Sequence, residues 1–305
     1  GHLPPTAGGK PAVTAGRTDD DGATGGTIIT GSTGRLGRAL MAAAPEAVLG
    51  WDRPLLDLDE PDCGAALVAR DRPELVVHSA AMTAVDDAAR DPDTAMRRNG
   101  RAVGSLAGAL RQAGARLVLI STNEVFDGER DDALGYSEDD EPNPRNAYGR
   151  SKLAGEMAAL EAYGGGNGLW IVRTAWLYGP PGNDFPDKIT AAADRLEPEP
   201  LGVVQDEIGS PTYSIDLARA IYALVDRTDG GTFHLANGGV ASRYDWAREI
   251  LAVRRPGREL RGMARADFVR PSDPPPWGVL DCTRAASNGV TLRSWQVALA
   301  DYLAG

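Results

Sequence analysis

The sequence predicts an α/β protein, a Rossmann-type doubly wound parallel sheet with a smaller, interleaved C-terminal substrate domain. Three observations carry this prediction. Short apolar runs alternate with longer helical patterns up to residue 172, a glycine-rich turn joins the first apolar run to the first helix, and proline-rich segments interrupt the alternation after residue 173. Strands that alternate with helices at this spacing indicate βαβ units, in which helices cover both faces of a parallel sheet.

The elements of the first part follow from apolar periodicity along the chain. Strands are predicted at Thr27–Thr30, Ala47–Trp51, Glu74–His78, Arg116–Ile120 and Leu169–Val172. Helices are predicted from the glycine-rich turn to Ala44, over Glu60–Arg70, over Asp91–Ala113 and over Ala147–Ala162. The five strands are short enough, and the helices long enough, for a parallel sheet with helical crossovers.

The domain boundaries follow from changes in composition. Residues 1–26 are rich in Gly, Pro, Thr and Asp and predict a disordered leader. Residues 27–172 are expected to form the NAD(P)-binding Rossmann domain. A strand at Leu201–Val204 and a helix at Ser214–Val225 are expected to return to its sheet, so that 201–228 belong to this domain as well. Residues 173–200 and 229–305 are then the substrate-binding domain.

Composition limits the classes of partner. The chain has 305 residues and a formal net charge of −11, which argues against nucleic acid or an anionic membrane surface as a partner. Its apolar runs are far shorter than a membrane span, and its first residues lack the basic start and apolar core of a signal peptide. Cys63 and Cys282 are expected to be free thiols in a reducing cytosol. These features predict a cytoplasmic protein.

The turn Gly31-x-x-Gly34-x-x-Gly37 lies directly between the first strand and the first helix. Glycines there allow a tight turn and a close approach of the backbone to a pyrophosphate, whose charge the helix N-terminus favours. The turn therefore predicts a dinucleotide site. Asp52, at the end of the second strand, could accept hydrogen bonds from a ribose 2′-OH, whereas Arg53 could hold a 2′-phosphate. The choice between NAD and NADP stays open.

Tyr148 and Lys152 are four residues apart on a predicted helix, so they share one helical face. A cation beside a phenol stabilises the phenolate, which suits a proton donor. Ser121 and Thr122 lie at the end of the preceding strand. The order of glycine turn, Ser-Thr and YxxxK resembles the extended branch of the short-chain dehydrogenase/reductase superfamily, whose members modify nucleotide sugars.

Further stretches resemble one family of that branch, the dTDP-4-dehydrorhamnose reductases. The stretches that carry the resemblance are "GSTGRLGRAL" (31–40), "AAMTAVDDA" (80–88), "ISTNEVFDG" (120–128), "NAYGRSKLAGE" (146–156), "VRTAWLYG" (172–179), "NDF" (183–185), "DEIGSPTYSIDLA" (206–218) and "FHLANGG" (233–239). They run in the family's order from about Thr27 to Leu303.

The resemblance implies NAD(P)H-dependent reduction of the C4 ketone of a dTDP-4-keto-6-deoxyhexose. Thr122, Tyr148 and Lys152 would be catalytic, with Tyr148 protonating the alkoxide. The resemblance implies Gly31, Gly34, Arg35 and Leu36 at the phosphates, with Ser32 and Thr33 of the same turn, and Ala80, Ala81, Met82, Tyr148 and Lys152 at the ribose and nicotinamide. Asn99 matches a helix position of the family pattern and is assigned to the cofactor site, with a structural role as the alternative. Besides Asp52 and Arg53 at the ribose, Asp57 and Leu58 lie where a loop could flank the adenine, although an acid at a helix start has the same pattern. The implied substrate-binding residues are Thr83, Val85, Glu124, Phe126, Trp176 and Arg270, the last of which could pair with a diphosphate. No metal ligand is implied.

The chain departs from the family mainly on the substrate side. Asn123 and Glu124 stand where the family has Asp-Tyr, Met82 where it has Tyr, and Ala89 and Gln205 where it has acids. Related dehydratases have Asp-Glu at 123–124, but an amide cannot protonate a leaving hydroxyl, so dehydration is not expected.

Two alternatives to a reductase stay open. Glu124 could act as the base of an epimerase, or the chain could be a non-catalytic nucleotide-binding regulatory subunit. The hexose, the nucleotide base and the choice between monomer and homodimer are not determined. His78 and His234 are expected to be packed histidines whose ring nitrogens are satisfied.

Overall fold

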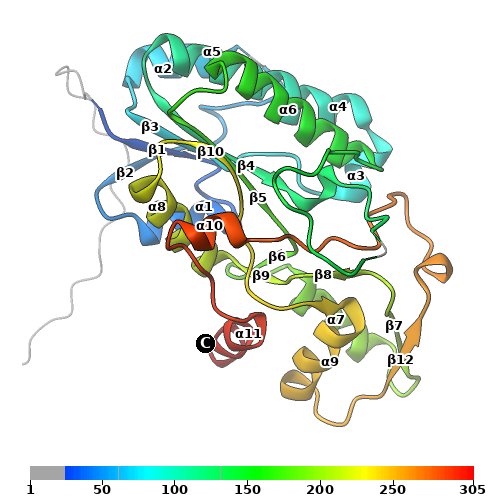
Figure 1. Ribbon diagram of the computed structural model, residues 1–305. Helices are drawn as coiled ribbons and strands as arrows, with labels where there is room; N and C mark the ends of the chain where they lie inside the picture. The colour runs from blue at the N-terminus through cyan, green and yellow to red at the C-terminus, as the bar shows by residue number, and fades with distance from the viewer. Residues whose placement is uncertain (1–24, 61, 131) are drawn as a thin grey trace, which may run out of the picture.

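The centre of the protein is a six-stranded parallel sheet (Figure 1), in a computed structural model that describes residues 25–60, 62–130 and 132–305. The strands lie in the order β10-β5-β4-β3-β1-β2. They are β1 (Thr27–Thr30), β2 (Val48–Trp51), β3 (Leu75–His78), β4 (Arg116–Thr122), β5 (Leu169–Thr174) and β10 (Gly231–His234). All pairs are parallel, which confirms the predicted class.

Helices cover both faces of this sheet (Figure 1). One face is covered by α2 (Cys63–Asp71), α5 (Ala102–Gln112) and α6 (Ala147–Tyr163), and the other by α1 (Arg35–Ala43), α8 (Ser214–Arg227) and α10 (Thr283–Ser287). Strand residues point alternately into these two layers: Ile28 joins the first core and Ile29 the second. Burial on both sides explains why the strands are continuously apolar in sequence.

The segment between β3 and β4 differs in detail from its prediction. The helical region expected over Asp91–Ala113 consists of α4 (Pro92–Met96), a π-helical turn (Arg97–Arg101) and α5. A short helix, α3 (Val85–Arg90), precedes it and was not predicted. Only Ala88 of α3 is fully buried, so its sequence carries no apolar periodicity.

A third, smaller core forms below the carboxyl ends of the sheet, as Figure 1 shows. Its helices are α7 (Phe185–Arg195), α9 (Arg243–Arg254) and α11 (Trp295–Ala304). Three two-stranded ladders accompany them: β7 (Leu201–Val204) with β12 (Leu260–Met263), β6 (Leu177–Tyr178) with β9 (Thr212–Tyr213), and β8 (Ile208–Gly209) with β11 (Ala241–Ser242). Trp246 and Tyr178 are fully buried at its centre. We call this part the lower lobe.

The expectation that Leu201–Val204 returns to the main sheet is wrong. This strand pairs with β12 in the lower lobe, while the sixth strand of the main sheet is β10. A four-residue apolar strand fits either sheet, because its sequence does not specify the strand with which it pairs. The helix that follows does return, because α8 packs on α1. The division into cofactor and substrate domains stays a prediction, and the predicted leader lies outside the described residues except for Gly25 and Gly26.

Candidate active site

A cavity of about 960 Å³ opens at the carboxyl ends of β1, β3 and β4 and continues to α7 and α9. In the sheet, β2 lies on one side of β1 and β3 lies on the other, so the direction in which strands are added reverses at β1. Doubly wound sheets bind their ligands at such a switch point. The predicted residues that line it are Gly31, Thr33, Gly34, Arg35, Leu36, Asp52, Arg53, Leu58, Ala80, Ala81, Thr83, Val85, Thr122, Glu124, Tyr148, Lys152 and Trp176. Six predicted residues do not line it: Ser32, Asp57, Met82, Asn99, Phe126 and Arg270.

The glycine turn has the shape that a pyrophosphate needs. Gly31 has a φ of +65°, and a Cβ on Gly37 would lie 2.0 Å from the carbonyl oxygen of Gly31. Gly34 begins α1 without any side-chain cap, so the N–H groups of the first turn have no side-chain acceptor there. The turn therefore offers both the space and the donors for a phosphate.

Asp52 holds this turn in place. Its carboxylate accepts hydrogen bonds from the Ser32 hydroxyl, from the backbone N–H of Thr33 at 3.2 Å and from the Thr33 hydroxyl at 3.0 Å. Ser32 thus faces Asp52 rather than the cavity. The sequence suggested that Asp52 binds a ribose. It did not indicate that Asp52 also accepts hydrogen bonds from Ser32 and Thr33 of the glycine turn.

Three arginines surround Asp59 next to the cavity, and two of them, Arg53 and Arg98, line it. Arg53, Arg97 and Arg98 all donate to its carboxylate, and the Arg98 guanidinium in particular holds the pKa of Asp59 well below its usual range. Asp57 pairs with Arg53 at 2.9 Å and stays out of the cavity. Since Asp52 and Arg53 both line the cavity, the structure leaves the choice between NAD and NADP open.

Asn99 acts on the cavity through the backbone. Its side-chain oxygen accepts from the N–H of Met82 at 2.8 Å, and its Nδ2 donates to the Met82 carbonyl at 2.9 Å and to Ser151 Oγ at 3.0 Å. Asn99 is buried, so it holds the segment that brings Ala80, Ala81 and Thr83 to the cavity. The Met82 side chain is not part of the lining.

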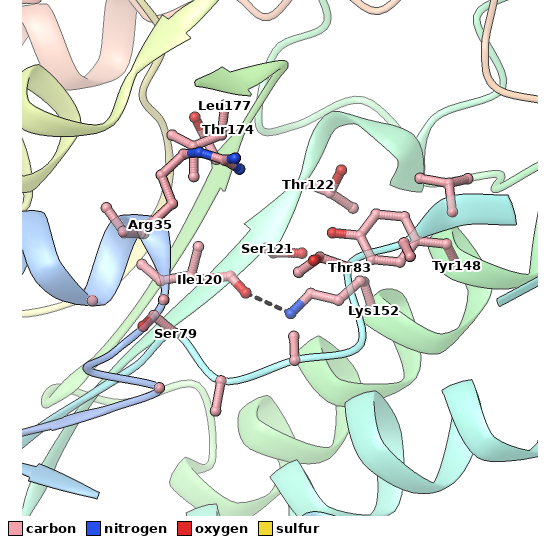
Figure 2. Close-up of a pocket in the computed structure, with 18 of the residues that line it drawn as sticks. Arg35, Ser79, Thr83, Ile120, Ser121, Thr122, Tyr148, Lys152, Thr174 and Leu177 are labelled. Carbon is pink, nitrogen blue, oxygen red and sulfur yellow. Dashed lines mark hydrogen bonds between the residues drawn. The ribbon is translucent and has the colours of Figure 1, made fainter. Parts of the chain in front are cut away.

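Thr122, Tyr148 and Lys152 meet in the middle of the cavity. Figure 2 shows Thr122 above the hydroxyl end of Tyr148, with Lys152 extended beneath them. Lys152 Nζ donates to the carbonyl oxygen of Ile120 at 2.7 Å. Burial lowers the pKa of Lys152 to about 8, against an opposing effect of Glu156. Burial and the Glu124 carboxylate raise the pKa of Tyr148, and the Thr122 hydroxyl partly offsets this.

This arrangement depends on the first turn of α6. Asn146 caps the helix, since its Oδ1 accepts from the N–H of Gly149 at 2.8 Å. The 3-10 turn Asn123–Val125 follows β4 and lies directly against Gly149, where a Cβ would be 2.0 Å from the carbonyl oxygen of Glu124. Only glycine allows the strand end and the helix to approach so closely.

Glu124 lies in the cavity beside Tyr148. Its Oε2 accepts from Asn146 Nδ2 at 2.6 Å. Burial and the nearby Glu207 raise the pKa of Glu124 to about 7, although Asn146, Arg243 and Arg270 act in the opposite direction. Asn123 also lines the cavity, and its Nδ2 donates to the carbonyl oxygen of Gly278 at 3.2 Å. Both unusual residues therefore lie where a ligand would bind, and Glu124 is the one that carries a titratable group.

The structure does not bring Phe126 or Arg270 to the cavity. Phe126 is fully buried and stacks on Tyr136, with ring centroids 4.3 Å apart, so it has no surface to offer a substrate. Arg270 lies 3.6 Å from Asp86 and 3.6 Å from Glu207. Arg270 is absent from the cavity lining, and this position, rather than its ion pairs, argues against the predicted diphosphate contact.

Sequence reasoning missed several lining residues of the lower lobe and of the π-helical turn. These are Arg98, Asn183, Asp184, Phe185, Lys188 and Arg243. Three of them, Asn183, Asp184 and Phe185, form the stretch "NDF" that contributed to the family resemblance, but the sequence analysis assigned them no role in the site. Lys188 and Arg243 lie on helices, where a cation facing a cavity has the same sequence pattern as one facing solvent.

The two described histidines are packed, as predicted, but each is satisfied on one nitrogen only. His78 Nδ1 lies 2.9 Å from Thr30 Oγ1, and His234 Nδ1 lies 2.9 Å from the carbonyl oxygen of Tyr136. Their Nε2 atoms have no partner among the described residues. Burial lowers the pKa of His78 to about 3 and that of His234 to about 3.

Three further properties concern the described residues as a whole. No three His, Cys, Asp or Glu side chains among them are grouped so as to hold a metal ion. Cys63 and Cys282 are free thiols, as expected. None of the helices in the described ranges combines the length and the apolar character that a membrane crossing requires.

Residues 26–305 match the family model described as "RmlD substrate binding domain". A dTDP-4-dehydrorhamnose reductase of Mycolicibacterium smegmatis is 39% identical over 91% of this chain and 84% of the relative. A probable dTDP-4,6-dihydroxy-2-methyloxan-3-one 4-ketoreductase of Streptomyces antibioticus is 40% identical over 89% of this chain and 92% of the relative. The crystal structure of dTDP-4-dehydrorhamnose reductase from Bacillus anthracis in complex with NADP has a TM-score of 0.83 and 33% identity, over 91% of this chain and 98% of that one.

Proposed function

This chain belongs to the dTDP-4-dehydrorhamnose reductase family, and on that premise we propose that it reduces the C4 ketone of a dTDP-4-keto-6-deoxyhexose with NAD(P)H. One observation carries the proposal. Thr122, Tyr148 and Lys152 converge in a single cavity that begins at an uncapped glycine turn. A proton donor, a neighbouring cation and a phosphate cradle are the parts that a ketoreductase needs.

The residues fit a nicotinamide dinucleotide. The glycine turn and the first turn of α1 would hold its phosphates, and Ala80 and Ala81 would border its ribose and nicotinamide. Two buried hydroxyls that line the cavity, Ser121 Oγ and Thr174 Oγ1, have no partner among the described residues and could bind polar groups of a ligand. When bound, the reduced nicotinamide supplies the hydride, and the chain supplies binding, orientation and the proton.

In this proposal Tyr148 donates the proton. As the C4 carbonyl is reduced, negative charge develops on its oxygen, and the Tyr148 hydroxyl transfers a proton to that atom. Thr122 donates a hydrogen bond to the same oxygen, and Lys152, fixed by the carbonyl of Ile120, places a positive charge next to the phenolate that forms. A phenol with a raised pKa stays protonated at neutral pH, so the proton is present when it is needed.

Tyr148→Phe tests this role. Removal of the hydroxyl should lower kcat by roughly 10²–10⁴-fold, the usual contribution of a general acid, and leave the affinity for NADPH nearly unchanged. The measurements are loss of absorbance at 340 nm with a dTDP-4-keto-6-deoxyhexose, and cofactor binding by calorimetry. Retained turnover would remove Tyr148 from the mechanism. Wild-type protein that binds cofactor but oxidises none with this substrate would overturn the proposed function.

Glu124 supports a second candidate, an epimerase. A carboxylate with a pKa of about 7 beside the carbonyl site could remove a proton from a carbon next to the ketone. Solvent deuterium would then enter the sugar at C3 or C5, and Glu124→Gln would abolish the exchange. A regulatory subunit is less well supported, because a protein that only binds nucleotide has no need of the Thr122, Tyr148 and Lys152 arrangement.

The net charge of −11 favours a small nucleotide-linked substrate over nucleic acid or an anionic membrane surface as the partner. We propose a cytoplasmic reaction and a monomer or homodimer, which sedimentation analysis would distinguish.

A further inference from the structure

Arg243 is a cation that the catalytic proposal does not use. It is the first residue of α9 in the lower lobe and lines the cavity on the side away from the glycine turn. A positive charge at the N-terminus of a helix is disfavoured by the helix dipole. The positive charge of Arg243 therefore needs stabilising contacts, and the aromatic rings and the carboxylate around its guanidinium provide them.

Aromatic rings hold the guanidinium in place. Its central carbon lies 3.5 Å from the ring centroid of Trp176, and Phe185 lies farther out at 5.5 Å. Trp176 itself is fixed, because it stacks on Trp246 and a Cβ on Gly209 would lie 2.7 Å from its ring. Stacking of this kind restrains a guanidinium without occupying its N–H groups.

A buried carboxylate anchors one edge of the guanidinium. Arg243 Nε donates to Glu207 Oε1 at 2.8 Å, and Glu207 is only 4% exposed. The backbone N–H of Arg243 also donates to the Glu207 carbonyl at 3.2 Å. The two terminal nitrogens of Arg243 have no partner among the described residues. They form a preoriented pair of donors, the geometry that binds phosphate oxygens in a bidentate way.

Most of the other cations that line the cavity are already engaged, and Lys188 on α7 is the exception among the described residues. Arg35 donates to the carbonyls of Gly179 and Gly182, Arg98 pairs with Asp59, and Lys152 donates to Ile120. Arg270 lies between two carboxylates outside the lining. Arg243 and Glu124 line the same cavity, whereas Arg270 does not, so Arg243 is the arginine of the two that a substrate bound there can reach.

We propose that Arg243, stacked on Trp176 and anchored by Glu207, binds the diphosphate of the sugar nucleotide. The inference rests on the proposed function, since it takes a sugar nucleotide as the substrate. It replaces Arg270, the arginine that the sequence suggested for this task. Glu207 and Trp176 are positioning residues in this arrangement, and Arg243 is the group that contacts the substrate.

Binding of dTDP and of thymidine to the full-length protein tests the proposal without turnover. Both can be followed by calorimetry. Arg243→Gln should weaken dTDP binding by about 10- to 100-fold and leave thymidine binding unchanged, because thymidine carries no phosphate. Arg243→Lys keeps the charge but not the paired donors and should give an intermediate loss. Arg248→Gln, an exposed arginine on the same helix, is the matched control and should bind dTDP like the wild type.

Unchanged dTDP affinity in Arg243→Gln would overturn the proposal, and so would an equal loss for dTDP and thymidine, which would mean that Arg243 only shapes the aromatic wall. The outcome is separate from that of the proposed function. Wild-type protein that binds dTDP through Arg243 but reduces no dTDP-4-keto sugar would contradict the reductase alone, whereas an active enzyme with intact dTDP binding in Arg243→Gln would contradict the inference alone.

Discussion

Glu124 shows how a single residue can set the pH range of a site. The side chain is held by Asn146 and lies near Glu207, and its pKa rises to about 7. When Glu124 is ionised, its charge raises the pKa of Tyr148 and so makes the phenol a weaker acid. It also adds a negative charge where the alkoxide develops. Ionised Glu124 should therefore slow reduction, whereas an epimerase would require the ionised form.

The pH dependence of kcat/KM distinguishes these roles. For a reductase, we expect the wild-type value to fall as pH rises through about 7, where Glu124 loses its proton. Glu124→Gln should shift this decrease to about pH 8, where Lys152 loses its charge. At pH 8 the variant should exceed the wild type by about tenfold, the effect of one nearby charge worth about 1.4 kcal/mol. Glu249→Gln, an exposed change on α9, should leave the profile as it is. A wild-type rate that rises through pH 7 would instead identify Glu124 as a base.

At the scale of elements, the site depends on the contact between the end of β4 and the start of α6. The turn Asn123–Val125 carries Glu124, α6 carries Tyr148 and Lys152, and Gly149 is the point at which the two meet. Farther along, the buried pair of Arg173 on β5 and Glu156 on α6, 2.7 Å apart, fixes the helix to the sheet. The relative placement of Tyr148 and the strand end is therefore set by packing.

Gly149→Ala tests this contact. The added Cβ would lie 2.0 Å from the Glu124 carbonyl oxygen, so the turn or the helix must move. A shift of about 1 Å at the reacting groups can lower kcat by roughly 100-fold, and we expect a loss of that order with Tyr148 and Lys152 both intact. Gly108→Ala on α5 is the control: nothing lies within 4 Å of its added Cβ, and the change should be neutral or stabilising. Equal kcat in the two variants would show that the close approach at Gly149 is not needed for catalysis.

At the scale of the whole molecule, the two buried histidines couple stability to pH. Both lie at strand ends of the central sheet, and both have a folded-state pKa of about 3, below the ordinary value of 6.5. They stay neutral in the folded state, while the unfolded chain takes up protons below pH 6.5. The unfolded state therefore gains protons as the pH falls, and stability is lost from about pH 7 downward toward pH 3.

Each histidine should lower the free energy of unfolding by roughly 1.4 kcal/mol between pH 7.5 and 5.5. His234→Gln keeps a donor for the Tyr136 carbonyl but removes one titrating group, so its loss over this interval should be smaller by that amount. Urea unfolding at the two pH values gives the loss in free energy of unfolding for each protein. The contribution of the carboxylates is the same in both proteins, so it cancels when the two losses are compared. Equal losses in wild type and variant would contradict the assignment of a neutral, buried His234.

Local patterns in the chain determined the main parts of this protein. Apolar runs such as Thr27–Thr30 and Arg116–Ile120 predicted strands buried on both faces, because such strands leave few positions for polar residues. The glycine spacing at 31–37 and the four-residue spacing of Tyr148 and Lys152 predicted a cofactor turn and a proton donor, because each depends on backbone geometry within a few residues. These predictions needed no knowledge of distant contacts.

Only the tertiary structure decided what depends on contacts between distant segments. It assigned β7 to the lower lobe and β10 to the central sheet, since a short apolar strand does not specify its partner. It buried Phe126 against Tyr136, matched Arg270 with carboxylates, and placed Arg243 in the cavity between Trp176 and Glu207. The physical reason is that burial and charge pairing are properties of the neighbours in space, and those neighbours lie tens to hundreds of residues away along the chain.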